Sequence, residues 1–286
     1  MTKQPSTHFT GGGGLTRPAG DTHATGAPAP ATLVEVVPVV DKGLGNASYL
    51  VNLGDGRAAV IDPQRDLRPY RSWARREHVT LSFAVETHIH ADFVTGSREL
   101  AHAGAQIIAA ASAGLAFEHS GVEDGQHVDL GGLSLELLAT PGHTPDHASW
   151  PVHEGNTPVG VFTGGALVVG GVARTDLAGA KDTQRWARAA YRSVRDRLLT
   201  LPDTLPVWPT HGPGSFCSTG GSDERTSTIG RERSSNPLLV GNPDEEESCT
   251  GWWAAWVPTR RISAGSRPTT GPDPSSTAGT GPPCPR

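Results

Sequence analysis

The chain has 286 residues and a formal net charge of -5, a length that allows one large domain or two small ones. Its acidic balance and the lack of a long Lys/Arg run argue against a nucleic-acid partner, and no segment has the apolar length needed to cross a bilayer. The N-terminal sequence lacks the charged-then-apolar pattern of a signal peptide, so we expect a cytoplasmic protein.

Residues 1–31 are rich in Gly, Thr, Pro and Ala, and we expect them to be disordered because they cannot bury a core. Strands and helices are interleaved after this segment. We expect strands over residues 33–40, 48–53, 57–62, 81–86, 106–110, 133–138, 159–162 and 206–209. We expect helices over residues 67–77, 95–103 and 182–199. The turn Gly54-Asp55-Gly56 predicts a hairpin, and the pattern as a whole predicts the α/β class.

A histidine motif follows the strand at 81–86. It places His88, His90 and Asp92 within five positions, directly after an apolar run that is typical of a buried strand. Imidazole and carboxylate groups at the end of a strand are the ligands that a zinc or iron site needs. The motif therefore predicts a metal site, although Asp92 is explained equally well as the cap of the following helix.

Three further strand ends carry polar side chains. His143 lies in a Pro-Gly-His-Thr turn, and the turn that ends at Gly165 is followed by Arg174 and Asp176. His211 begins a His-Gly-Pro-Gly-Ser segment after the strand at 206–209. A satisfied loop histidine is the plain alternative for His211, and a structural ion pair is the plain alternative for Arg174 with Asp176.

These motifs, in this order over roughly residues 33–242, resemble the metallo-β-lactamase superfamily. They are most similar to those of the persulfide dioxygenases (sulfur dioxygenases) and their relatives that are fused to rhodanese domains. The matching segments are His88-Ile-His-Ala-Asp92, Thr140-Pro-Gly-His-Thr144, Ala173-Arg-Thr-Asp176, Thr210-His-Gly-Pro-Gly-Ser215, and Thr228-Ile-Gly-Arg-Glu232 with Asn236-Pro237. The resemblance implies a four-layer αββα metallo-β-lactamase sandwich over residues 32–242.

The resemblance also implies a single Fe(II) held by two histidines and one aspartate, with His88 and His143 as the histidines. Such a face leaves positions open for O₂ and a persulfide sulfur. The expected reaction converts glutathione persulfide, or a related thiol persulfide, and O₂ to the thiol and sulfite. His90 and Asp92 would act beside the metal by orienting water or ligands, and His211 would complete the polar wall of the metal site.

Two arginines are candidates for the thiol carrier. The resemblance implies that Arg174 and Arg231 lie near the glutathione-like part of the substrate. An ion pair explains Arg174 as well, and a solvated surface stretch explains Arg231 with its charged neighbours Glu232 and Arg233. The sequence leaves open whether the chain forms a homodimer.

The chain departs from the family pattern at two positions. Phe93 stands where the third histidine of the motif is expected, which argues against a binuclear hydrolase. Gly165 stands where the family has its carboxylate ligand, and a glycine offers no ligand. A set of three histidines, His88, His90 and His143, with Asp92 nearby, would suit zinc as well as Fe(II). Asp146 and Asp176 are weaker substitutes for the missing carboxylate.

The sequence therefore leaves three functions open. The first is a persulfide dioxygenase-like oxidoreductase. The second is a metal-dependent hydrolase of a thioester or lactone, which needs a metal-activated water and usually a second ion. The third is a catalytically impaired relic that binds a metal or a thiol without turnover.

Residues 243–286 change character abruptly. Trp252, Trp253 and Trp256 crowd together, and Ser, Thr, Gly, Pro and Arg dominate the rest of the tail. We expect this tail to be disordered, because no helix or strand period is visible in it. The three tryptophans also suggest a frameshift in the gene, a hypothesis that resequencing tests directly.

Overall fold

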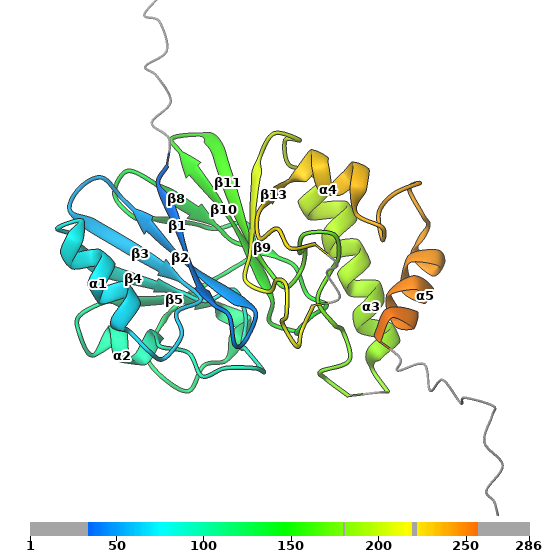
Figure 1. The fold of residues 1–286 in the computed structure, drawn as a ribbon, viewed down its shortest axis with the longest axis horizontal. Helices are drawn as coiled ribbons and strands as arrows, with labels where there is room; N and C mark the ends of the chain where they lie inside the picture. The colour runs from blue at the N-terminus through cyan, green and yellow to red at the C-terminus, as the bar shows by residue number, and fades with distance from the viewer. Residues whose placement is uncertain (1–33, 180, 219–221, 257–286) are drawn as a thin grey trace, which may run out of the picture. The chain divides into compact units, whose positions relative to one another are not determined.

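The computed structural model describes residues 34–179, 181–218 and 222–256 (Figure 1). These residues belong to one compact unit that begins at Val34. The segment 1–31 and the tail beyond residue 256, both expected to be disordered, lie outside the described residues. In the part of the chain that is described, no helix has the length and apolar character needed to cross a membrane.

Two β-sheets form the centre of the structure. The first sheet has the strand order β1-β2-β3-β4-β5-β6, with β1 Val36–Asp41, β2 Asn46–Asn52, β3 Arg57–Ile61, β4 Thr80–Val85, β5 Gln106–Ala110 and β6 Ser120–Val122. The second has the order β13-β12-β11-β10-β8-β7, with β7 His127–Asp129, β8 Ser134–Glu136, β10 Ala148–Glu154, β11 Thr157–Gly164, β12 Pro206–Pro209 and β13 Ser227–Thr228. The short strand β9, Leu138–Ala139, pairs with β10 beside this path.

Helices flank the sheets. They are α1 Arg68–Arg76, α2 Ser97–Ala101, α3 Thr183–Arg192, α4 Ile229–Ser235 and α5 Glu245–Trp256. A π-helical turn, Ser193–Arg197, and a 3₁₀ turn, Leu198–Thr200, extend α3, and a second 3₁₀ turn covers Ala111–Ala113. The expected helix at 182–199 is therefore a continuous helical run whose second half is not a regular α-helix.

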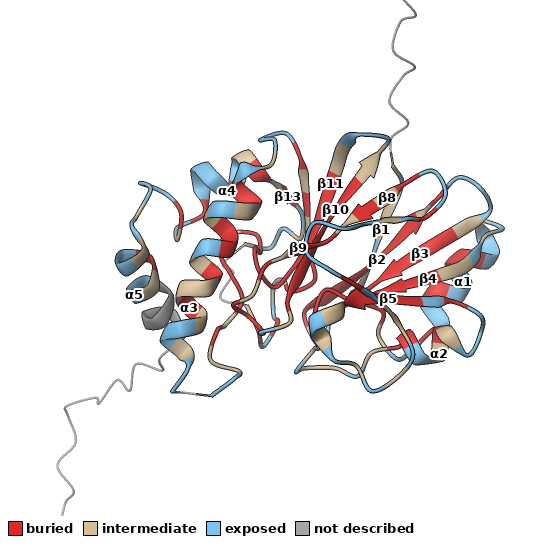
Figure 2. Ribbon diagram, turned by 180° about the vertical axis from the view of Figure 1, so that it is seen from behind, coloured by how far each residue is buried: buried red, intermediate tan, exposed pale blue. Residues whose placement is uncertain are grey.

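Alternation along the strands explains the layers. In β2, Tyr49 and Val51 enter the core between the sheets, whereas Leu50 packs on the other side with Tyr70 and Trp73 of α1. Successive side chains of a strand point to opposite faces, so a strand that is apolar on both faces must be covered twice. In Figure 2 the central strands are largely red, the colour of buried residues, whereas the outer strand β1 has no buried residue.

The second sheet repeats this arrangement. Phe162 of β11 packs between the sheets near Trp150, and its neighbour Val161 packs outward against Val194 and Leu198 of the helical run. The two sheets thus face each other across one core, with helices on both outer faces. The predicted αββα sandwich is confirmed, as is the hairpin of β2 and β3, which pair in antiparallel register.

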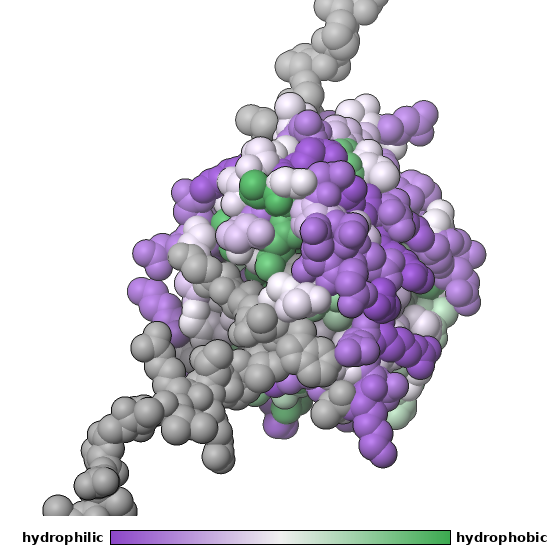
Figure 3. All heavy atoms as spheres, turned by 90° about the vertical axis from the view of Figure 1, so that its right-hand side faces the viewer, coloured by the Kyte–Doolittle hydropathy of each residue, from purple (hydrophilic) through white to green (hydrophobic). Residues whose placement is uncertain are grey.

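The expectation of disorder from residue 243 onward is wrong for Glu245–Trp256, which form helix α5. This helix lies against α3, where Arg188 bonds Glu245 and Glu246, and Arg192 bonds Glu245. Figure 3 looks onto this side of the molecule, and hydrophilic residues cover most of the surface that is coloured there. The acidic residues of α5 lie in its first turn, and its apolar residues follow one another without a helical period, so the hydrophobic pattern did not reveal the helix.

Candidate metal centre

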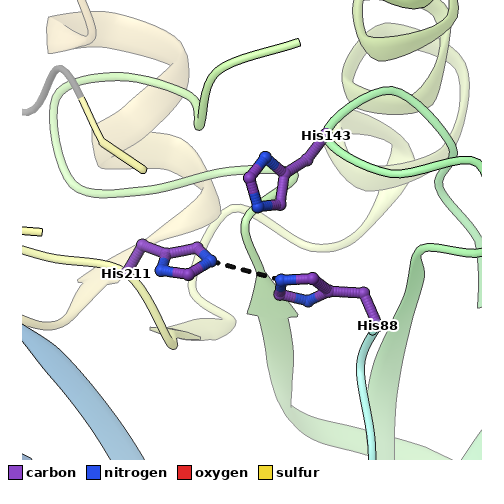
Figure 4. Close-up of side chains that lie close together, drawn as sticks. All are labelled: His88, His143 and His211. Carbon is purple, nitrogen blue, oxygen red and sulfur yellow. Dashed lines mark hydrogen bonds between the residues drawn. The ribbon is translucent and has the colours of Figure 1, made fainter. Parts of the chain in front are cut away.

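Three loops meet where strands of the two sheets end. The loop after β4 carries His88, the turn before β10 carries His143, and the loop after β12 carries His211. The three side chains are almost fully buried, and one nitrogen of each lies within 4.8 Å of the other two. Figure 4 shows the three rings pointing toward one another from separate segments.

Backbone hydrogen bonds hold these loops together. The amide of Ala148 donates to the carbonyl of Thr87 at 2.8 Å, and the amide of Thr210 donates to the carbonyl of Gly164 at 3.0 Å. The amide of Ala47 donates to the carbonyl of Thr210, which joins the first sheet to the end of β12. The loops that carry the histidines are therefore parts of the sandwich rather than independent surface segments.

The tautomer of His88 follows from its neighbours. The Thr87 hydroxyl donates to Asp62 Oδ2 at 2.7 Å, so its oxygen is left to accept from His88 Nδ1 at 2.8 Å. Asp62 is fully buried and also accepts from the Thr87 amide and the Thr210 hydroxyl. With its proton on Nδ1, His88 presents the lone pair of Nε2 to the cluster.

The other two histidines of the cluster have the same tautomer as His88. His143 Nδ1 donates to the carbonyl oxygen of Arg174 at 2.6 Å, which can only accept. His211 Nδ1 donates to Asn46 Oδ1 at 3.0 Å, and the orientation of Asn46 is fixed because its Nδ2 donates to Asp92. Each ring therefore keeps its proton on Nδ1 and directs a lone pair on Nε2 into the cluster.

The cluster is suited to a cation. Nε2 of His88 lies 3.3 Å from Nε2 of His211 (Figure 4), and Nε2 of His143 is buried without a hydrogen-bond partner. Burial lowers the pKa of His143 to about 4 and holds the pKa of His88 and His211 well below their usual range. Three neutral imidazoles with convergent lone pairs and no proton between them are the donor set of a metal site.

His147 is a fourth buried histidine near the cluster, but both of its ring nitrogens already have hydrogen-bond partners. Its Nδ1 is paired with the Thr140 hydroxyl at 2.9 Å, and its Nε2 accepts from the amide of Gly165 at 2.9 Å. Burial lowers its pKa to about 3. His147 therefore stays neutral and fixes the turn at Gly165, while its ring stacks on His88 at 4.9 Å between centroids.

His90 lies at the flank of the cluster. Its Nε2 is 3.3 Å from Asp62 Oδ1 and 3.7 Å from Glu86 Oε2, and its ring stacks on Phe93 at 4.1 Å. Burial opposes the charged form of His90, but the attraction of Asp62 and Glu86 outweighs it and raises the pKa. Burial also raises the pKa of Glu86 to about 7. His90 has potential ligand atoms within 4.8 Å of Asp62 with His88, and of Asp92 with His211.

Asp92 acts on the cluster through Asn46. Its Oδ2 accepts from Asn46 Nδ2 at 2.8 Å and lies 3.7 Å from His211 Nδ1, whereas its Oδ1 is buried without a partner. The structure thus brings Asp92, His90 and His211 together. In this geometry the carboxylate of Asp92 orients a ligand through an amide, which is the usual role of a group behind a metal-binding histidine.

Gly165 has no space for the side chain that the family pattern places there. A Cβ at this position would lie 2.6 Å from His143 Cδ2 and 2.9 Å from Ala173 Cβ. The two candidate substitutes do not join the cluster, because Asp176 pairs with Arg174 and Asp146 accepts from the Ile89 amide. Among the described residues, neither aspartate belongs to a group of ligand atoms that could hold an ion.

The two predicted substrate-binding arginines lie in different places. Arg174 forms a two-point ion pair with Asp176 at 2.7 and 2.8 Å, and its guanidinium lies 4.4 Å from the ring centroid of Phe216. It adjoins the cluster because its carbonyl holds His143. Arg231 lies on α4, pairs with Glu224, and lines a cavity that contains none of the clustered histidines.

Sequence reasoning missed Asp62 and Asn46. Both are fully buried polar residues that hold the histidines in place. The signal for Asp62 was its position at the end of an apolar strand parallel to the one that precedes the histidine motif. The signal for Asn46 was weaker, because it opens a strand and its contact with His211 joins residues that are 165 positions apart.

Comparison with known proteins places this geometry in a family. The family model for the metallo-beta-lactamase superfamily matches residues 41–211. The human protein "Persulfide dioxygenase ETHE1, mitochondrial" is 33% identical over 203 residues, which cover 69% of this chain and 73% of that protein.

Solved structures agree with the sequence comparison. The crystal structure of ETHE1 from Myxococcus xanthus aligns with a TM-score of 0.67 and 28% identity, covering 79% of this chain and 92% of that one. A metallo-beta-lactamase from Staphylococcus aureus subsp. aureus COL aligns with a TM-score of 0.69 and 30% identity, covering 82% of this chain and 68% of that one. The chain therefore belongs to the metallo-β-lactamase superfamily and, within it, to the ETHE1-like branch.

Proposed function

We propose that this chain binds one metal ion through His88, His143 and His211 and oxidises a low-molecular-weight thiol persulfide. In balanced form, the persulfide RSSH, O₂ and water give the thiol RSH, sulfite and two protons. The observation that carries the proposal is the convergence of three Nε2 lone pairs in a buried site. The similarity to the persulfide dioxygenase ETHE1 supports the reaction class.

Fe(II) is the ion that this reaction requires. Iron would supply the redox chemistry with O₂ that the side chains of the site lack, whereas zinc has no redox chemistry. The protein residues orient the donors: the Asp92–Asn46 pair holds His211, the Asp62–Thr87 pair holds His88, and the Arg174 carbonyl holds His143. We assign His90 to the wall of the site, where Asp62 and Glu86 favour its protonated form.

Metal content measured by inductively coupled plasma mass spectrometry tests the site. We expect about one iron per chain in protein purified without chelator, and its loss in His211→Ala. The exposed His102→Ala is the matched control and should keep the metal. An equal metal content in both variants would remove His211 from the proposed ligand set.

The identity of the metal and the turnover then separate the three functions. Iron together with oxygen uptake and sulfite release from a persulfide supports the dioxygenase. Zinc together with thioester or lactone hydrolysis would favour the hydrolase instead, because three histidines suit a zinc-bound water. A chain that retains no metal would be the catalytically impaired relic.

A further inference from the structure

A cavity of about 270 Å³ lies beside the metal cluster, and His88 and His90 are part of its wall. The rest of the wall is mainly apolar and is formed by three alanines together with larger side chains. These larger side chains are Ile89, Phe93, Val94, Leu115 and Phe117. A cavity that reaches a proposed ligand and is otherwise apolar is suited to the organic part of a substrate.

Two large apolar side chains of this wall are exposed to solvent. Ile89 is 49% exposed and Val94 is 64% exposed. Large aliphatic side chains are costly to leave in water when they gather at one place, and such a place usually binds something apolar. The apolar character of the cavity therefore extends outward along Ile89 and Val94.

The charges in the wall are unfavourable for an anion. Its acidic residues are Glu86 and Asp146, and none of the residues that line it is a lysine or an arginine. The Arg98 guanidinium lies over the Phe117 ring, 5.7 Å from its centroid, but is not part of the wall. The two carboxylates of glutathione would find no lysine or arginine among the lining residues, and the imidazole of His90 already faces the carboxylates of Asp62 and Glu86. The volume is also at the low end for a ligand the size of a tripeptide.

We propose that this cavity receives the organic group of the persulfide, and that this group is an apolar chain or ring rather than a glutathionyl peptide. This inference rests on the proposed function, because it names the substrate class of the same site. It places the terminal sulfur toward His88 and the carbon chain against Phe93, Leu115 and Phe117.

Binding of the corresponding thiols tests the inference without turnover. The full chain is titrated calorimetrically, without oxygen, with ethanethiol, butanethiol, hexanethiol and glutathione. We expect the affinity to rise roughly three- to fourfold for each added methylene, the value for complete burial of a methylene. We expect glutathione to bind at least about tenfold more weakly than hexanethiol, as it lacks apolar contacts here. Tighter binding of glutathione, or no dependence on chain length, would overturn the inference.

Variants locate the bound chain. Ala113→Phe should fill the cavity and weaken hexanethiol binding by at least about tenfold, while ethanethiol binding changes little. Val94→Asp should also weaken hexanethiol binding, whereas Val240→Asp should not. Val240 is a fair control because it is similarly exposed, at 50%, but does not line the cavity. Equal effects of the two valine variants would place the thiol elsewhere and reject the cavity.

The two proposals fail in different ways. Sulfite release from glutathione persulfide by a chain that binds hexanethiol no better than ethanethiol would overturn the cavity inference and leave the proposed function standing. Chain-length-dependent binding that Ala113→Phe abolishes, without sulfite from any persulfide, would overturn the proposed function and leave the cavity inference standing.

Discussion

Adding one methyl group at Gly165 tests whether His143 is a fixed part of the site. The new Cβ would lie 2.6 Å from His143 Cδ2 and 2.9 Å from Ala173 Cβ, both closer than van der Waals contact allows. The His143 ring cannot turn away freely, because its Nδ1 is bonded to the Arg174 carbonyl at 2.6 Å. Gly165→Ala must therefore displace either the ring or the backbone at Ala173.

The expected magnitude follows from this overlap. Forcing one methyl group into a packed interior costs about 1–3 kcal/mol of folding free energy. In a domain of this size each kcal/mol shifts the melting temperature by about 2–4 °C, so we expect a decrease of about 2–12 °C. A ring tilted at His143 also directs Nε2 away from the cluster, and we expect metal affinity to fall by about 10- to 100-fold.

Thermal unfolding with and without chelator, together with metal content, measures both effects. Gly251→Ala is the control, because it is the same chemical change at a helical position with nothing within 4 Å of the new Cβ. It should be neutral or slightly stabilising, since alanine favours helix over glycine. Gly165→Ala protein as stable and as metal-loaded as the control would refute the reasoning. So would Gly165→Asp protein that binds metal more tightly than the native chain.

Three further predictions address neighbouring groups. Asn46→Ala should lower metal affinity about 10- to 100-fold, because His211 loses its orienting partner. Asn52→Ala should leave metal content unchanged, because the half-buried Asn52 bonds Glu35 and Gly54 and none of the clustered histidines. Equal losses in the two variants would contradict this. Burial depresses the pKa of His147 to about 3 in the folded chain, below its usual value of 6.5. The contribution of neutral His147 to the free energy of unfolding is therefore fully present above pH 6.5 and is lost as the pH falls toward 3. In urea unfolding without metal, the free energy of unfolding of His147→Gln should therefore fall less steeply between pH 6 and 4 than that of the native chain. The difference in slope should be up to about 1.4 kcal/mol per pH unit. Trp150→Phe should cost about 1–3 kcal/mol in chemical denaturation, because it leaves a buried backbone carbonyl without its donor.

Local sequence signals predicted most of the fold. The strands expected at 106–110 and 206–209 coincide with β5 and β12, and the hairpin of β2 and β3 follows its Gly-Asp-Gly turn. These elements are set by apolar runs and turn residues that are adjacent in the chain. The histidines of the candidate metal centre could be picked out for the same reason, since each directly follows a recognisable strand or turn.

Strand β10 shows what local signals cannot predict. It is central in the second sheet, yet it contains Pro151, which normally argues against a central strand. On one side β9 pairs with Ala148 and Ser149, and β8 pairs with Val152 and the residue after it. Pro151 falls in the gap between these two partners, where its missing N–H is not needed. Only the tertiary arrangement creates that gap.

Helix α5 was missed although a signal for it was present. Asp244 accepts from the amide of Glu247 at 2.9 Å, and the Glu247 carboxylate accepts from the amide of Asp244 at 3.3 Å. This reciprocal pair is a capping box, which marks the start of a helix independently of any apolar period. The composition of the tail hid the signal, because an abrupt change to tryptophan and polar residues favoured disorder.

The two departures from the family pattern, Phe93 and Gly165, together explain which three histidines converge. Phe93 stacks on His90, whose Nε2 faces Asp62, so His90 lies at the flank of the cluster. Gly165 leaves the space beside it to the His143 ring, which a side chain there would displace. The third imidazole that completes the set is then His211, held from the first sheet through its bond to Asn46. Each replacement alone suggests a lost ligand, but their combined geometry gives a site of three histidines in which neither position needs to supply one.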